Sequence, residues 1–196
     1  MKRLLLIFIL TFSFQSLTKA DDISDFEIEG ISIGDSALDH YTKNELNNGI
    51  KSYYPNKKFY LMDFKTKGSS YDGIQLAFKQ NDKTFKIYSI SGAIFFINKP
   101  FKDCLKRQKE ITKEITNKFD NIKVKDGPIY DHPADKTGES KKKDVEIIFT
   151  KTSELILIDC IDWSKRITNE KNWGDNLGVG LYSKEYENWL RFKAFN

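Results

Sequence analysis

The chain has 196 residues, of which 31% are charged, 14% are aromatic and 39% are hydrophobic. This composition is typical of a well-solvated globular domain and excludes an intrinsically disordered chain. Without the three basic residues of positions 1–20, 29 basic residues face 28 acidic ones, so the net charge of about +1 predicts neither a nucleic-acid nor a membrane partner.

Residues 1–20 have the layout of a secretory signal peptide. Lys2 and Arg3 precede the apolar run Leu4–Leu10, and small and polar residues follow as far as Ala20. The run is shorter than the roughly 20 apolar residues that span a bilayer. We therefore expect cleavage after Ala20 and a periplasmic or secreted mature chain, residues 21–196, that forms a single α+β domain without a transmembrane segment. A retained N-terminal anchor helix is the alternative.

The first half of the mature chain predicts two short helices and three strands. Residues 25–33 alternate weakly and predict a short strand or extended arm, and Asp35 or Ser36 then caps a brief helix. A capping box at Thr42 starts the next helix, which is expected to end near residues 49–53 because Pro55 disfavours helical geometry before it. Strands are expected at about 58–64, 72–79 and 84–97. The third is apolar on both faces, which predicts a central strand with a bend or bulge at Ser91-Gly92.

The second half begins with the main predicted helix, from Pro100 to Phe119, whose apolar arc includes Cys104. A long loop is expected before strands at about 144–151 and 154–162, and this loop contains His132 and the run Lys141–Lys143. A polar loop, 164–172, leads to a strand at 177–181, where Gly178 and Gly180 leave one face bare. Ser183 starts the last helix.

This order predicts an α+β fold with an antiparallel sheet of about six or seven strands and helices packed on it, in two α-β-β-β halves. The layout resembles the BamE and beta-lactamase-inhibitor-protein class of periplasmic domains. The segment DFEIEGISIGDSALDHYTKNEL and the tryptophan-containing tail resemble small exported proteins of unknown function from marine alphaproteobacteria. The second resemblance implies a bacterial origin and brings no activity with it.

Cys104 and Cys160 are the only cysteines, and export would place both in an oxidising compartment. Cys104 faces the sheet from the main helix, and Cys160 shares a strand face with Ile156 and Ile158, so we predict a disulfide between them. A nucleophilic Cys160 would need a base, and the sequence offers only His40 and His132. A zinc site is less favoured because neither cysteine belongs to a close pair.

Asp131, His132 and Asp135 form the strongest candidate for chemistry. A histidine between carboxylates can bind a metal or act as a general base. The competing interpretation is a solvated loop in which His132 caps a turn, and we favour it because no second group of ligands is visible. Asp159 and Asp162 flank Cys160, but residues three apart on a strand point to opposite faces, so we expect Asp159 at a sheet margin and Asp162 in the following turn.

The best binding candidate is the loop between Trp163 and Trp173, which also carries Lys165 and Arg166. Aromatic and cationic side chains on a loop can stack on a ligand, although a tryptophan at a loop end also commonly packs over the core. The sequence predicts no catalytic residue, metal or cofactor, and it favours a non-catalytic exported domain that binds an envelope protein or a surface polymer. The alternative is a small metal-dependent or hydrolytic enzyme that uses the Asp131, His132 and Asp135 loop.

Overall fold

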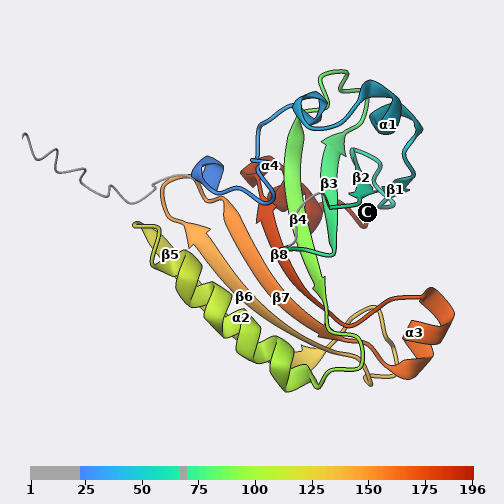
Figure 1. Ribbon diagram of the computed structural model, residues 1–196, viewed down its shortest axis with the longest axis vertical. Coiled ribbons are helices and arrows are strands. Elements are labelled where there is room, and N and C mark those ends of the chain that lie inside the picture. The colour runs from blue at the N-terminus through green and yellow to red at the C-terminus, as the bar shows by residue number, and fades with distance from the viewer. Residues whose placement is uncertain (1–22, 67–69) are drawn as a thin grey trace, which may run out of the picture.

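The computed structural model describes residues 23–66 and 70–196, so the expected signal peptide lies outside the described residues. The described chain is α+β and is built on one antiparallel sheet of eight strands with the order β1-β2-β3-β4-β8-β7-β6-β5 (Figure 1). The strands are β1 (Lys51–Tyr53), β2 (Phe59–Phe64), β3 (Gly73–Lys79), β4 (Ile87–Phe95), β5 (Ile122–Asp131), β6 (Lys141–Phe149), β7 (Leu155–Asp162) and β8 (Asn176–Tyr182). The helices are η1 (Ile23–Asp25), η2 (Ala37–Asp39), α1 (Lys43–Asn48), α2 (Phe101–Thr116), α3 (Lys165–Lys171) and α4 (Lys184–Phe192).

The expected count of six or seven strands was wrong because β1 and β5 are edge strands. All three residues of β1 are exposed, as are eight of the ten residues of β5, so neither shows the alternation of apolar and polar residues that marks a half-buried strand. The segment expected as a long loop before residue 144 is therefore mostly β5 and the start of β6. Residues 25–33 follow on from the end of η1 and contain only an isolated bridge between Ile28 and Ile31 instead of a strand.

Side-chain caps begin the helices where the sequence predicts them. The Thr42 hydroxyl accepts a hydrogen bond from the Glu45 amide, and the Glu45 carboxylate accepts one from the Thr42 amide, which completes the capping box. Ser36 caps η2 and Ser183 caps α4. Pro100 is the N-cap residue of α2, one position before the first helical residue.

The two faces of the sheet are covered by different elements. On the α2 face, α2 and the N-terminal segment pack on a large core that includes Ile147, Ile158 and Val179. On the opposite, α4 face, Tyr186 and Trp189 of α4 pack on a smaller cluster around Phe59 and Ala77. Both faces of the central sheet are thus partly buried, which explains the apolar residues on both sides of β4.

β4 is central, as predicted, but its irregularity lies elsewhere. The register shift falls opposite Ala77 and Phe78, near the start of β4, and not at Ser91-Gly92. Gly92 instead leaves room for the ring of Tyr71, which a Cβ at position 92 would overlap.

The predicted disulfide is confirmed. Cys104 of α2 and Cys160 of β7 are bonded, with their Cα atoms 6.0 Å apart, and both are almost completely buried. The bond ties the main helix to the middle of the sheet, so it excludes the thiol chemistry that we weighed for Cys160.

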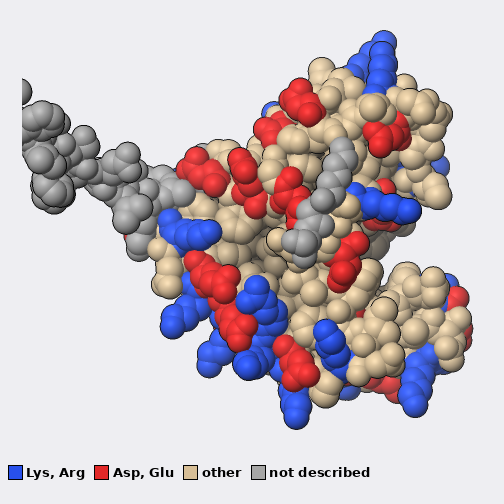
Figure 2. Space-filling model, viewed as in Figure 1, with Lys and Arg blue, Asp and Glu red and all other residues tan. Residues whose placement is uncertain are grey.

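The outer face of α2 carries lysine side chains with acidic side chains among them (Figure 2). Arg107 pairs with Glu110 at 3.2 Å and with Glu114 at 3.5 Å. These contacts fit the solvated helix face that the charge pattern indicates.

Candidate functional site

The segment between Trp163 and Trp173 is helical, so the polar loop expected at 164–172 is corrected to α3. The Ser164 hydroxyl accepts a hydrogen bond from the Ile167 amide at the start of α3, and Asn172 ends the helix in the left-handed conformation, with φ 55°. Ile167 is the only buried residue among the seven of α3, so the sequence showed no apolar periodicity. Because α3 is so short, the two tryptophans that flank it lie side by side.

Three of the predicted binding residues form a cluster of aromatic rings that are tilted against one another by 53° and 52°. The ring of Trp163 lies 4.2 Å from that of His132 and 4.8 Å from that of Trp173, measured between centroids. His132 Nδ1 accepts a hydrogen bond from the Ala134 amide at 3.1 Å. Burial, followed by the positive charge of Lys142, lowers the pKa of His132, so the imidazole is neutral at neutral pH. His132 therefore packs against the ring of Trp163 as an uncharged aromatic group.

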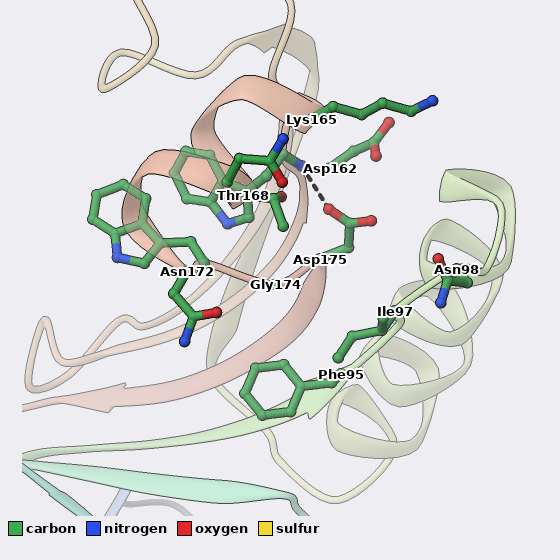
Figure 3. A pocket seen from close by; sticks show the side chains of 12 residues that line it. Phe95, Ile97, Asn98, Asp162, Lys165, Thr168, Asn172, Gly174 and Asp175 are labelled. Atoms are coloured by element: carbon green, nitrogen blue, oxygen red, sulfur yellow. Dashed lines mark hydrogen bonds between the residues drawn. The ribbon is translucent and has the colours of Figure 1, made fainter.

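Beside this aromatic cluster lies a pocket of about 710 Å³ (Figure 3). Its apolar wall is unusually open to solvent, since Trp173 is 42% exposed, Phe95 43% and Ile97 59%. The pocket is lined by Phe95, Ile97, Asn98, Asp162, Trp163, Lys165, Thr168, Asn169, Asn172, Trp173, Gly174 and Asp175. A volume of this size suits a small organic ligand or the end of a larger one.

Two carboxylates belong to the pocket wall. One oxygen of Asp175 accepts a hydrogen bond from the Trp163 amide at 2.7 Å, which fixes the tryptophan backbone at the pocket (Figure 3). Burial raises the pKa of Asp162, and the negative charge of Asp175 raises it further. In the part of the chain that the structure describes, neither carboxylate has a cationic group within ion-pair distance.

Lys165 is one of the residues that line the pocket, whereas Arg166 is not. An Arg166 guanidinium N–H donates to Asp135 at 2.6 Å, and the Asp135 side chain is completely buried. The hydroxyls of Ser140 and Ser164 donate to the same carboxylate at 2.7 Å and 3.0 Å. Hydrogen bonds to its ionised form, that of Ser140 first, hold the pKa of Asp135 far below its usual range.

The Asp131, His132 and Asp135 loop does not present its side chains to a common point. Asp131 pairs with Lys141 at 2.6 Å, His132 packs against Trp163, and Asp135 is turned inward as a hydrogen-bond acceptor. Among residues 23–66 and 70–196, no three or more His, Cys, Asp and Glu side chains are grouped as a metal site would require.

Asp159 does not lie at a sheet margin, where the sequence placed it. It lies within the sheet on the α4 face, where Lys142 pairs with Asp159 at 3.0 Å and with Asp144 at 3.1 Å. Gly178 on the neighbouring strand leaves the space that the Asp159 carboxylate occupies. The flanking lysines Lys141 and Lys143 pair with Asp131 and Asp126, so the basic run of β6 is neutralised within the protein.

The sequence did not point to five important pocket residues, namely Phe95, Ile97, Asn98, Asp162 and Asp175. Asp162 was expected in a turn and not as part of a binding site. Phe95 reaches the site because β4 pairs with β8, where Phe95 lies opposite Asn176. The only feature of the local sequence that could have indicated Phe95 and Ile97 was the apolar end of the run that forms β4, which the structure shows to be exposed.

The comparisons with family models and with curated proteins provide no relative from which a role could be transferred. No family model matches the chain, and no curated protein matches it significantly. In the described part of the chain, no helix is both long and apolar enough to cross a membrane.

Proposed function

We propose that this protein is an exported, non-catalytic binding domain that holds its ligand in the pocket between Trp173 and Phe95. The observation that carries this proposal is the exposed apolar wall of that pocket beside polar groups that converge on it, because rigid aromatic surfaces with a few polar groups are the usual make-up of a ligand site. The aromatic cluster and the Asp135 contacts hold this wall in place before any ligand arrives.

The buried disulfide supports the periplasm or the extracellular space as the location, since disulfides persist in oxidising compartments. A component of the bacterial envelope is the partner that this location favours. The layout of the first 20 residues supports cleavage of a signal peptide before the protein reaches it.

The proposal is tested by following the indole N–H resonances of the three tryptophans in the purified mature protein. We expect at least one compound from a panel of choline, Nα-acetyl-lysine methylamide, maltose and inorganic phosphate to shift the signal of Trp173. The signal of Trp189 should not move, because this residue is buried in the α4 cluster, 2% exposed.

A Trp173→Ala variant provides the matched control, since its ring is half exposed and the variant should keep its far-UV circular dichroism. It should lose the response of Trp163 to the same compound. If none of the four compounds moves Trp163 or Trp173, the pocket is not a ligand site of this kind.

A further inference from the structure

The pocket has an uncompensated negative charge. Asp162 and Asp175 both line it, and the only basic residue in the wall is Lys165. Lys165 supplies one positive charge against these two carboxylates, and no ion pair joins it to either of them in the described residues. A ligand that fills this space therefore meets more negative than positive charge.

The apolar wall beside these carboxylates is aromatic on two sides. Trp173 and Phe95 are each less than half exposed but open to the pocket, and Ile97 extends the same surface. The face of an aromatic ring attracts a cation within about 6 Å of its centre, and tryptophan does so most strongly. A site that combines aromatic faces with carboxylates lacking an ion-pair partner attracts a positively charged organic group more strongly than a site with only one of these features.

Anionic and neutral ligands fit this surface less well than cationic ones. An anionic ligand would be repelled by both carboxylates. A neutral sugar could stack on Trp173 and donate hydrogen bonds to Asp162 and Asp175, but it would leave two partly desolvated negative charges without compensation. A cation removes that cost as it binds.

We infer that the pocket between Trp173 and Phe95 binds an organic cation, an ammonium or guanidinium group on an apolar carrier, with Asp162 and Asp175 as its counter-ions. This inference rests on the proposed function, because it names the chemical class of the ligand at the same site. The cation belongs either to a free amine or to a basic side chain of a peptide, and the two sources are separated by the test.

The experiment compares choline with 3,3-dimethyl-1-butanol, which has nearly the same shape and no charge. Titrations of the mature protein are followed by the indole resonances of Trp163 and Trp173 at low ionic strength. We expect choline, or Nα-acetyl-lysine methylamide as the peptide-like probe, to bind about tenfold or more tightly than the neutral alcohol, within the range of a cation–π contact aided by a carboxylate. The tighter of the two cations identifies the source.

Asp162→Asn and Asp175→Asn are the critical variants. An asparagine oxygen at position 175 can still accept the hydrogen bond from the Trp163 amide, so this variant removes the charge and keeps the structure. Each variant should weaken cation binding several-fold and leave the weak binding of the alcohol unchanged. Asp131→Asn, which removes an exposed carboxylate outside the pocket wall, should leave both unchanged.

The inference is overturned if the cations bind no better than the alcohol, or if the asparagine variants bind the cations as tightly as the original chain. In either case, a response of Trp173 to maltose would still support the proposed binding pocket, although not its preference for a cation. If no compound moves the indole signals, the proposed function fails together with the inference.

Discussion

Asp135 organises the pocket without lining it. It accepts hydrogen bonds from Ser140, Thr137 and Ser164 and forms an ion pair with Arg166. These contacts join the segment after β5 to the first turn of α3. The adjacent Trp163 and His132 are fixed through these contacts. The sequence offered Asp135 a chemical role only in the alternative interpretation and Arg166 as a candidate binding residue, and the structure pairs these two side chains with each other.

Replacing Asp135 by asparagine should lower stability and weaken its dependence on acid pH. The folded protein holds the pKa of Asp135 far below the usual 3.8, so the stability that it contributes is present above about pH 4 and is lost as the pH falls below that value. We expect urea unfolding of Asp135→Asn to give a smaller free energy at neutral pH and a shallower decline towards pH 2 than the original chain.

Asp131→Asn is the control for this comparison, because Asp131 lies in the same segment, is exposed and pairs only at the surface. Its acid profile should follow that of the original chain. Equal acid slopes for Asp135→Asn and the original chain would show that Asp135 is not the ionised acceptor described here.

Among the elements, β5 shows how an exposed edge is protected. It pairs only with β6 in the described part of the chain, so its other side presents unpaired backbone groups along ten residues. A register shift between Asp126 and Ile129 interrupts the strand, Pro128 removes an amide donor there, and Lys123 and Lys125 add charge. Bulges, proline and lysine are the usual means of preventing strands from pairing between molecules.

A Pro128→Val variant should therefore associate more readily than the original chain. Valine restores an amide donor and raises strand propensity at the interruption. We expect sedimentation velocity to show a concentration-dependent shift to dimers or larger species, with little change in the unfolding midpoint. Lys151→Val, in the turn after β6, is the control for added hydrophobicity. A monomeric Pro128→Val at high concentration would contradict the protective role.

The elements that could be predicted have strong local signals, and the others depend on distant partners. α2 shows a clear apolar arc, α1 has its capping box, and β7 has an apolar run, so their places were read correctly to within a few residues. β5 and α3 carry mostly charged, exposed residues, because one lies at a sheet edge and the other covers little core.

The same distinction divides the candidate site. Trp163, Trp173, Lys165 and His132 are brought together by a short helix and an adjacent segment, and the sequence pointed to them. Phe95 and Ile97 join them only through the pairing of β4 with β8, and local patterns contain no information on that pairing. The two carboxylates of the pocket, Asp162 and Asp175, lie close to the two tryptophans in the sequence, but Asp162 was expected in a turn and Asp175 was not considered.

For the whole molecule, the Cys104–Cys160 bond is the main covalent constraint on the second half of the sheet. It joins two cysteines that lie 56 positions apart in the sequence, and closing a loop of that length stabilises the fold by up to about 4 kcal/mol in the loop-entropy account. A Cys104→Ser, Cys160→Ala double variant should thus lose about 2–4 kcal/mol of unfolding free energy in urea.

The intact protein should be two hydrogen atoms lighter than its reduced form, and a disulfide-linked pair of proteolytic peptides should contain Cys104 and Cys160. The double variant should keep the circular dichroism of the original chain under native conditions, which separates lost stability from lost structure. Freely alkylated thiols in native material would contradict the bond.

The pairing of β4 with β8 also sets the order in which the molecule can fold. Most neighbouring strands are joined by short connections, whereas Ser89 of β4 pairs with Tyr182 of β8, across nearly half the chain. Contacts between residues so far apart form late, because the intervening chain must first be ordered. In a chain synthesised from its N-terminus, β4 waits with one edge unpaired until β8 has emerged, and this interval is when the chain is most prone to aggregate. The pocket takes one wall from the end of β4 and the other from the residues just before β8, so the ability to bind a ligand should be the last property that the folding chain acquires.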